Sequence, residues 1–372
     1  MKSKLMERAI ELALKGKGKT SPNPMVGAVI YNNRKIVGEG YHRKAGTDHA
    51  EIVAIKKAGK LTKDAALYVT LEPCCHTGRT PPCTKTIIKS GIKKVVIGMH
   101  DPNPIVAGKG IKELQDAGIL VLTGLLERDV KRINESYIKY IKTGYPFVLM
   151  KVGMSLDGKI ATSARESKWI TSETSRKIVH SIRSEVDGIM IGAGTLLQDN
   201  PNLLVTPRKR KNAARIIVDS SLKTPIDYNV LDNLSIARTI FITTELADKK
   251  KIKLFQDKGA EIILTPLDSG RVDIKEGMKK LGEMGITSIM LEGGSDLNYS
   301  CLSKELVDKV IFFIAPKIIG GKDGISSVGG KGIADLKDAF HLTDISLKEE
   351  GKDIIVEGYI KQKKGRKTAY ND

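Results

Sequence analysis

The chain has 372 residues, of which 41% are hydrophobic and 28% charged, and its formal net charge at pH 7 is +19. This composition is typical of a globular protein with two domains, and four cysteines are too few for a disulfide scaffold. With no apolar run of about 18 residues and no apolar core at the N-terminus, we expect a cytoplasmic protein without membrane helix or signal peptide. The positive charge indicates anionic partners, either nucleic acid or phosphorylated small molecules.

The first half alternates helices and strands. A helix with one apolar face is predicted over 3–15, followed by two strands joined by a turn at 26–31 and 35–39. Helices and strands then alternate in the order helix, strand, helix, strand, helix, strand over 49–59, 67–73, 84–91, 93–99, 110–118 and 119–124. One long helix over 127–142 leads to a domain boundary near 144–146. This order predicts a mixed sheet covered by helices.

The second half continues the alternation. It begins with a strand over 147–155, an Asp157-Gly158 turn and another strand. Helices are predicted over 172–185 and 275–284, and strands over 187–192, 214–219, 238–243, 260–265 and 287–291. The section from 308 onward is expected to be β-rich. We therefore expect domains at 1–144 and 145–361, with a solvated basic tail at 362–372.

Three of the four cysteines fall within TLEPCCHTGRTPPC, residues 70–83. Clustered cysteines in a reducing compartment favour metal binding or catalysis. Zinc prefers thiolate and imidazole ligands, and a catalytic zinc site uses three protein ligands and leaves one position open. The sequence predicts that these ligands are Cys74, Cys83 and, from DHAEIVA, His49.

Glu51 follows His49 by two residues and is the predicted proton carrier. The first residues at a helix N-terminus need not be fully helical, so both side chains can face one cavity. A bound metal lowers the pKa of its water toward about 7. Glu51 then takes the proton from this water and returns it to a leaving amine. This arrangement is typical of zinc deaminases.

Alternatives to this site remain open at the level of sequence. Cys75 competes with Cys74 as a ligand, but neighbouring side chains point apart, so we expect Cys75 to be a buried apolar residue. A structural zinc site would take His76 as its fourth ligand, although it would not explain Glu51. Fe²⁺ or Co²⁺ could occupy the same ligands. Cys301 stands alone and is expected in the core.

HAE at 49–51, TLEPCCHTGRTPPC and DPNPIVAGKGI at 101–111 closely resemble the bifunctional riboflavin-biosynthesis deaminase/reductase family. In the second half KVGMSLDGKIAT, SKWIT, IGAGTLLQDNP and LEGGS extend the resemblance over nearly the whole chain. The HTGRTPP insertion distinguishes this family from nucleic-acid and free-nucleoside deaminases. The resemblance implies an N-terminal cytidine-deaminase-like α/β/α sandwich, a C-terminal dihydrofolate-reductase-like α/β domain, and a homo-oligomer, either dimer or tetramer.

The family's first reaction is the zinc-dependent hydrolytic deamination of 2,5-diamino-6-ribosylamino-4(3H)-pyrimidinone 5′-phosphate. By resemblance, a set of polar residues in the first half binds this substrate: Asn23, His42, His76, Arg79, Asp101 and Asn103. Arg79 is the natural phosphate partner, because a guanidinium binds two oxygens at once. Asn23 and Asn103 also lie in Asn-Pro turns, and His42 could simply end a strand, so each has a purely structural alternative.

The second reaction is implied to be the NADPH-dependent reduction of the ribosyl group to a ribityl chain. From the residues alone, LEGGSDLN places glycines between a strand and a helix, where a phosphate can approach; the alternative is a turn without a ligand. By resemblance, NADPH is held by Gly153, Trp169, Thr195, Asp199, Ser220, Gly294, Ser295, Asp296, Leu297, Asn298, Tyr299 and Ser300. The substrate would meet Ser167, Arg183, Leu203 and Glu292.

Several features of the second half leave choices open. Trp169 could be a core aromatic instead, and Lys151, expected at a strand end, is a further candidate for polarising the sugar carbonyl or binding phosphate. The family has an arginine shortly after DNP-x-L, where this chain has Thr206, so phosphate binding would depend on Arg208 or on Arg183. We also hypothesise that Asp199 favours a protonated imine.

Two other functions compete with the two-step enzyme. An RNA or nucleoside deaminase with a basic nucleic-acid-binding C-terminal half explains the charge of +19 but not the HTGRTPP insertion or the LEGGS loop. Its aromatic content of 5% also provides few stacking surfaces for bases. A zinc-stabilised binding module without chemistry is the third. We expect a phosphorylated pyrimidine as the partner, and neither nucleic acid nor a membrane.

Overall fold

The computed structural model describes residues 2–76, 81–205 and 212–361. They form two compact units, the first ending at Gly144 and the second beginning at Tyr145. Arg79, Thr206, Arg208 and the predicted basic tail lie outside the described residues. Within the described ranges, none of the helices combines the length and the apolar character needed to span a bilayer.

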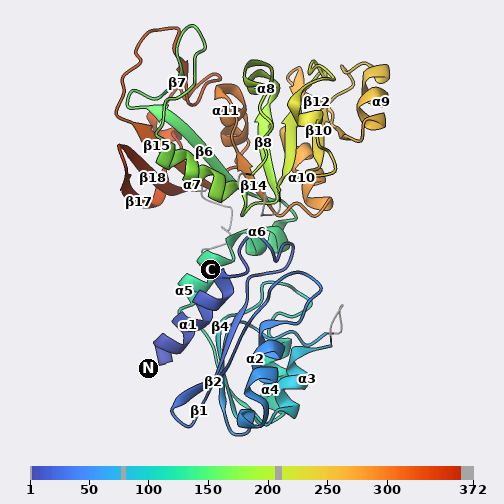
Figure 1. The fold of residues 1–372 in the computed structure, drawn as a ribbon, viewed down its shortest axis with the longest axis vertical. Coiled ribbons are helices and arrows are strands. Elements are labelled where there is room, and N and C mark those ends of the chain that lie inside the picture. Colours follow the sequence, from blue (N-terminus) through green and yellow to red (C-terminus); the bar gives the residue numbers. More distant parts are fainter. Residues whose placement is uncertain (1, 77–80, 206–211, 362–372) are drawn as a thin grey trace. The chain divides into compact units, whose positions relative to one another are not determined.

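The first unit is built on a five-stranded sheet (Figure 1), in the order β2 (Lys35–Tyr41), β1 (Gly27–Asn32), β3 (Ala66–Leu71), β4 (Lys94–Met99) and β5 (Leu120–Leu122). Strand β1 runs antiparallel to β2 and β3, whereas β3, β4 and β5 are parallel. The carboxyl ends of these parallel strands therefore meet at one edge of the sheet. The segments that follow β3 and β4 at this edge carry Cys74, Asp101 and Asn103, whereas His49 and Glu51 lie at the start of α2.

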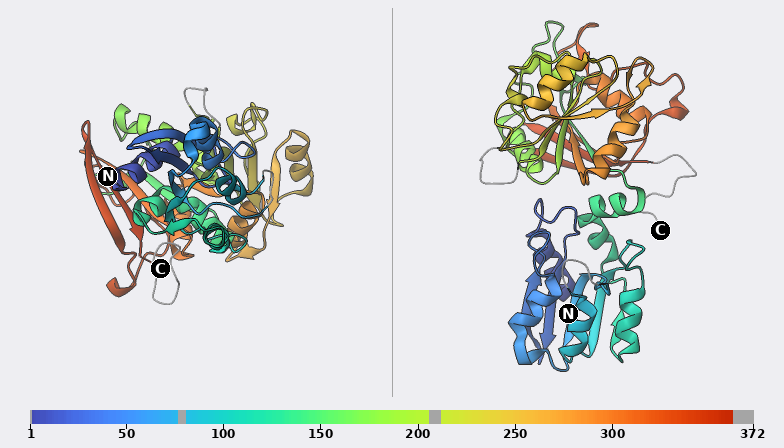
Figure 2. Two further views of the ribbon diagram at one scale, coloured as in Figure 1. Left: turned by 90° about the horizontal axis from the view of Figure 1, so that it is seen from below. Right: turned by 90° about the vertical axis from the view of Figure 1, so that its right-hand side faces the viewer.

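Helices cover both faces of this sheet (Figures 1 and 2), with α1 (Lys2–Leu14) and α5 (Glu127–Ile133) on one face and α2 (Ala50–Ala58), α3 (Cys83–Lys89) and α4 (Lys109–Asp116) on the other. The apolar face predicted for the first helix is confirmed by the residues that α1 buries: Leu5, Met6, Ala9, Leu12 and Ala13. Gly27 permits this close packing, because a Cβ there would lie 1.9 Å from the carbonyl oxygen of Ala9.

The long helix predicted over 127–142 is wrong, because the structure breaks it into α5 and α6 (Glu135–Thr143) at Asn134. The backbone of Asn134 has φ −111° and ψ 19°, outside the helical region. Its side chain accepts a hydrogen bond from the N–H of Met25 (2.7 Å) and donates one to the carbonyl of Met25 (3.0 Å). The break therefore lets a buried amide satisfy a distant loop.

The second unit contains a nine-stranded sheet, in the order β11 (Glu261–Leu264), β10 (Thr239–Thr243), β9 (Ala214–Val218), β8 (Gly188–Gly192), β14 (Ser288–Leu291), β6 (Phe147–Ser155), β15 (Lys309–Ala315), β18 (Asp353–Ile360) and β17 (Leu342–Glu350). The strands from β11 to β15 are parallel, and β18 and β17 form an antiparallel extension. Short pairs add β7 (Lys159–Ala161) with β16 (Ile325–Ser326), and β12 (Leu267–Asp268) with β13 (Arg271–Val272).

Two helix layers also cover the nine-stranded sheet (Figure 2): α7 (Glu173–Arg183), α8 (Ala193–Asp199) and α9 (Lys249–Asp257) on one face, α10 (Ile274–Glu283) and α11 (Ser295–Ser303) on the other. Within β10, Phe241 packs under α9 and Ile242 under α10, which follows from the alternation of side chains along a strand. Helices α8 and α9 were not predicted. Cys301 is fully buried in this core, as predicted.

Candidate functional site

Two of the three predicted metal ligands of the first unit lie at the starts of helices, and the third lies just after a strand. His49 is the residue before α2 and has an extended backbone with φ −72° and ψ 161°. Cys83 is the first residue of α3, and Cys74 lies in the irregular segment after β3. In a regular helix, side chains two residues apart point in different directions. Because His49 is not yet helical, its ring and the side chain of Glu51 can face the same cavity.

The ligand atoms converge. The Nδ1 of His49 lies 3.1 Å from the Sγ of Cys83 and 3.5 Å from the Sγ of Cys74, and the three atoms lie within 4.8 Å of one another. Tetrahedral zinc with bonds of about 2.0 Å to nitrogen and 2.3 Å to sulfur separates such ligands by about 3.5 Å. The donor set therefore fits zinc. His76 is exposed and outside this group, so a four-ligand structural site has no support among the described residues.

The charges at this site suit metal binding and proton transfer. The neighbouring Cys83 thiol, with His49, lowers the pKa of Cys74 to about 4, whereas the same contact raises the pKa of Cys83. Cys74 is therefore the first thiolate, and the second forms when a cation compensates its charge. Glu51 is 3% exposed, and burial raises the pKa of its carboxyl to about 6. A carboxyl with this pKa both accepts and releases a proton near neutral pH.

Two groups of predicted substrate residues lie near the ligands. The Nδ2 of Asn23 lies 3.1 Å from the Nε2 of His42, and the His42 ring contacts that of His49 edge-on, at 5.4 Å between centroids. Asp101 and Asn103 follow β4, and burial, with a smaller contribution from the charge of Cys74, raises the pKa of Asp101 to about 6. The structure thus brings Asn23 and His42 to the His49 side of the ligands and places Asp101 within electrostatic reach of Cys74, while Arg79 lies outside the described residues.

Cys75 differs from the expectation of full burial, because it is only partly buried. It belongs to the irregular segment after β3 rather than to the strand. Burial still raises the pKa of its thiol, which disfavours the thiolate form that would compete with Cys74 for a metal.

The second unit has a cavity of about 1920 Å³. Its wall includes every residue predicted to hold substrate or cofactor in this half except Asn298 and Tyr299. Glycines shape one side of it. Gly294 precedes α11, and a Cβ on Gly293 or Gly294 would lie 2.9 Å from the Oδ1 of Asn298 or 3.0 Å from the Oγ1 of Thr195. That buried Oδ1 has no hydrogen-bond partner. The volume and this close-approach wall fit a dinucleotide.

A buried ion-pair cluster stands in the cavity wall. The carboxylate of Glu292 accepts two hydrogen bonds from Arg183, at 2.6 and 2.9 Å, and one from Lys151 at 3.2 Å. Burial alone would raise the pKa of Glu292, but Lys151 and Arg183 outweigh it and lower the pKa to about 2. Lys151 lies in the middle of β6 and not at a strand end as expected, although the bounds of β6 match the strand predicted over 147–155.

Trp169 is 63% exposed, so the alternative of a core aromatic is wrong. The guanidinium of Arg176 lies 4.4 Å from the centre of its ring, and Lys317 donates to its carbonyl oxygen at 2.7 Å. Nearby, Lys168 lies 3.8 Å from the carboxylate of Asp199. These contacts fix the rim of the cavity around an exposed aromatic face.

Sequence reasoning missed three polar residues near the two sites. His180 lines the cavity with a buried Nδ1 that has no hydrogen-bond partner, and its spacing of three from Arg183 on α7 was a usable signal. Glu72 and Tyr137 hold the segment after β4, and both are buried. Glu72 was visible only as the residue between a strand and Pro73, which does not by itself indicate a role.

Comparisons with known proteins agree with the two-unit division. Residues 1–99 match the cytidine and deoxycytidylate deaminase zinc-binding region, and residues 146–356 match the RibD C-terminal domain. The riboflavin biosynthesis protein RibD of Actinobacillus pleuropneumoniae is 45% identical over 352 residues, covering 95% of this chain and 93% of that protein.

Solved structures give the same result. Acinetobacter baumannii RibD superposes with a TM-score of 0.87 at 32% identity, covering 97% of this chain and 99% of that one. A diaminohydroxyphosphoribosylaminopyrimidine deaminase/5-amino-6-(5-phosphoribosylamino)uracil reductase from Thermotoga maritima superposes with a TM-score of 0.82 at 36% identity, covering 96% and 98%. The predicted fold class, a deaminase-like unit followed by a reductase-like unit, is thereby confirmed.

Proposed function

This chain belongs to the RibD family and is a bifunctional deaminase and reductase of riboflavin biosynthesis, and we propose that it acts on the two substrates in the name of its Thermotoga maritima relative. The first unit would remove an amino group, as ammonia, from the diaminopyrimidinone ribosylamine phosphate. The second would reduce the ribosyl chain of the product. From the same membership we propose a cytoplasmic homo-oligomer that binds no nucleic acid.

The observation that carries the deaminase half is the convergence of His49, Cys74 and Cys83, with the carboxyl of Glu51 buried beside them. Zinc, when bound by these three residues, lowers the pKa of water and so supplies a nucleophile at neutral pH. Glu51 takes the proton of the attacking water on its carboxylate and passes it to the departing amine. Water adds to the carbon as ammonia leaves, so atoms and charges balance. Asn23, His42, Asp101 and Asn103 would orient the pyrimidine.

The reductase half is supported by the cavity and by its charged cluster. NADPH, when bound along Gly293 and Gly294, supplies a hydride for the sugar carbon. Arg183 and Lys151, already oriented by Glu292, would hold the anionic substrate, because charged donors in a partly buried wall bind phosphate strongly. Asp199 would favour a cationic imine through its negative charge. The alignment of donor and acceptor carbons is then the main contribution of the cavity.

Both activities can be measured in one experiment. The purified chain is mixed with the diaminopyrimidinone nucleotide and NADPH, and ammonia release and NADPH oxidation are followed separately. We expect ammonia first and oxidation afterwards. Ammonia without oxidation would contradict the reductase half, and the absence of both signals would contradict the proposal as a whole.

Glu51→Gln separates the two halves. It keeps the shape of the side chain but removes the proton carrier, so ammonia release should fall by about 10²–10⁴-fold. The zinc content and the reduction of separately supplied deaminated product should not change. Glu39→Gln is the matched control, because Glu39 pairs with Arg8 at the surface of the same unit. Ammonia release that survives in Glu51→Gln would refute the assigned role.

A further inference from the structure

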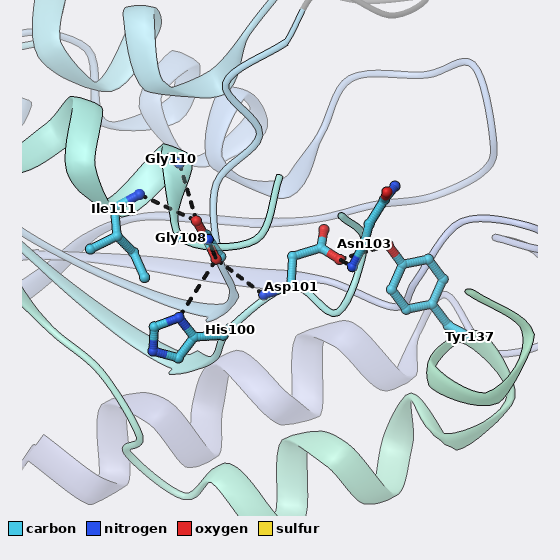
Figure 3. A network of polar contacts seen from close by, with 8 residues as sticks. His100, Asp101, Asn103, Gly108, Gly110, Ile111 and Tyr137 are labelled. Atoms are coloured by element: carbon cyan, nitrogen blue, oxygen red, sulfur yellow. Dashed lines mark hydrogen bonds and ion pairs between the residues drawn. The ribbon is translucent and has the colours of Figure 1, made fainter. Parts of the chain in front are cut away.

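Glu72 is a buried carboxylate at the carboxyl end of β3, separated from Cys74 only by Pro73. Its side chain has 0% exposure. Its two oxygens accept four hydrogen bonds from backbone N–H groups: Oε2 from Asp101 (3.2 Å) and Gly108 (3.1 Å), Oε1 from Gly110 (3.1 Å) and Ile111 (3.3 Å). The four donor residues are labelled in Figure 3. An ionised carboxylate only accepts hydrogen bonds, so it suits four donors.

All four donors belong to one segment, 101–111, which runs from the end of β4 into α4. The N–H groups at the start of a helix have no partner within the helix, and Glu72 supplies acceptors and a favourable negative charge there. The contact is close, since a Cβ on Gly110 would lie 2.1 Å from the carbonyl oxygen of Pro73. Glu72 therefore fastens the segment to the strand end that carries Cys74.

The same segment presents two predicted substrate residues. The Oδ1 of Asp101 accepts hydrogen bonds from the N–H of Asn103 (2.9 Å) and the hydroxyl of Tyr137 (2.9 Å), as Figure 3 shows. Glu72 thus holds Asp101 by its backbone, while Tyr137 holds it by its side chain. Asp101 is thus connected to Cys74 by one hydrogen bond to Glu72 and by the two peptide bonds that join Glu72, Pro73 and Cys74.

We propose that Glu72 is a positioning residue for the deaminase reaction. Its carboxylate fixes segment 101–111, and so places Asp101 and Asn103 where the pyrimidine binds beside the metal ligands. The proposal rests on the deaminase function proposed above and deepens it. Glu72 does not touch substrate itself. It acts through the backbone of the residues that do.

Glu72→Gln is a sharp test because each oxygen serves two donors. In either orientation of the new amide, its NH₂ group faces two backbone N–H groups, so two hydrogen bonds are replaced by contacts between donors. His49, Cys74 and Cys83 keep their side chains, so the zinc content should be unchanged. The matched control is Asp116→Asn, a carboxyl-to-amide change on the exposed side of α4, where Asp116 pairs with Lys112.

The full-length zinc enzyme is used throughout. For Glu72→Gln we expect the KM of deamination to rise at least about tenfold while kcat changes less than about threefold, because binding groups move and the proton carrier does not. Hydrogen–deuterium exchange should accelerate in peptides covering 101–111. The reduction of separately supplied deaminated product should match the wild type. Asp116→Asn should change none of these.

Three results would overturn the proposal. Glu72→Gln with wild-type KM, whatever its exchange, would make Glu72 a purely structural cap. A loss of zinc would show that it acts on the metal ligands instead. A wild-type enzyme that releases no ammonia would overturn the deaminase function together with it, whereas an active wild type leaves only the role of Glu72 at stake.

Glu72→Asp covers the case in which the amide variant does not fold. It keeps the charge and shortens the side chain by one methylene, so the variant should fold. Its KM should lie above that of the wild type but below that of an enzyme in which segment 101–111 is no longer held. A raised KM with full zinc content supports the proposal. A wild-type KM in Glu72→Asp, with faster exchange over 101–111, contradicts it.

Discussion

Asp101 in the first unit and Glu292 in the second are both buried carboxyl groups just beyond the ends of parallel strands, yet their pKa values shift in opposite directions. Burial raises the pKa of Asp101 to about 6, against opposing hydrogen bonds from Asn103 and Tyr137. Burial would do the same to Glu292, but Lys151 and Arg183 lower its pKa to about 2. Place in the fold therefore does not decide the charge of a buried acid, whereas its partners do.

The contrast matches what the two sites handle. Around His49 and Cys74 the neighbours are thiols, an imidazole and acids of raised pKa, which serve a metal and proton transfer. Around Glu292 the neighbours are cations, which serve anionic substrate and cofactor. In the first site the three ligand atoms lie within 4.8 Å of one another, whereas the second site is a cavity of about 1920 Å³.

Of the variants that test this comparison, Glu292→Gln should have the largest effect on stability. It leaves Arg183 and Lys151 partly uncompensated in a buried wall, and the lowered pKa of Glu292 corresponds to about 3 kcal/mol of stability at pH 7. We expect a loss of that size in the free energy of unfolding of the second unit. Urea titration monitored by hydrogen–deuterium exchange of second-unit peptides measures it within the whole chain. An unchanged free energy would mean that the pair contributes nothing net.

The pH dependence of that loss is a second test. The folded pKa of Glu292, about 2, lies below the ordinary value of 4.5, so its stabilisation is fully present above pH 4.5. As the pH falls from 4.5 toward 2, the wild type should lose its advantage over Glu292→Gln. The difference between the two chains in urea midpoint, followed across this range, reports it. A difference that stays constant with pH would contradict the lowered pKa.

Asp101→Asn should change the free energy of unfolding in the opposite direction to Glu292→Gln, and by a smaller amount. Because the folded pKa of about 6 lies above the ordinary 3.8, ionised Asp101 destabilises the first unit, and this penalty grows as the pH rises from 3.8 to 6. The variant lacks the penalty, so its stability relative to the wild type should improve by about 2 kcal/mol between pH 4 and pH 7. First-unit peptides in the same exchange experiment measure it. A relative stability that worsens over this range would reverse the comparison.

Glu261→Gln gives the smallest expected effect and calibrates the others. Glu261 accepts two hydrogen bonds from Arg238 at 2.7 and 2.9 Å, the same geometry as Arg183 with Glu292. Here the side chains are 49% and 39% exposed, so solvent screens the pair. We expect a loss below about 1 kcal/mol. A loss equal to that of Glu292→Gln would show that burial is not what distinguishes the two pairs.

The features that sequence predicts well are local or periodic. The apolar face of α1 follows from helical spacing, and His49, Cys74 and Cys83 follow from a chemistry that needs those residue types. The break at Asn134 could not be predicted, because its partner Met25 lies 109 residues away. The partners of Glu72 are backbone N–H groups, which every residue except proline carries, so no residue type reveals them.

The wide cavity depends even more on long-range contacts. Its wall draws on segments from Lys151 to Gly332, so the resemblance to a known family, rather than any one motif, indicated its residues. The bounds of β6 were predicted correctly from its apolar run, and they already place Lys151 at mid-strand, but its ion pair with Glu292, 141 residues away, is not visible in the sequence. His180 was missed although its spacing of three from Arg183 places both side chains on one face of α7.

The exposed ring of Trp169 has a practical consequence for anyone working with the enzyme. It is the one tryptophan of the chain and it stands in the cavity wall, so all of the protein's indole emission originates beside the site that should receive the reduced nicotinamide. Light emitted by indole is absorbed by that ring system. Occupancy of the cavity should therefore dim the protein's own fluorescence, with no label attached and no background from a second indole.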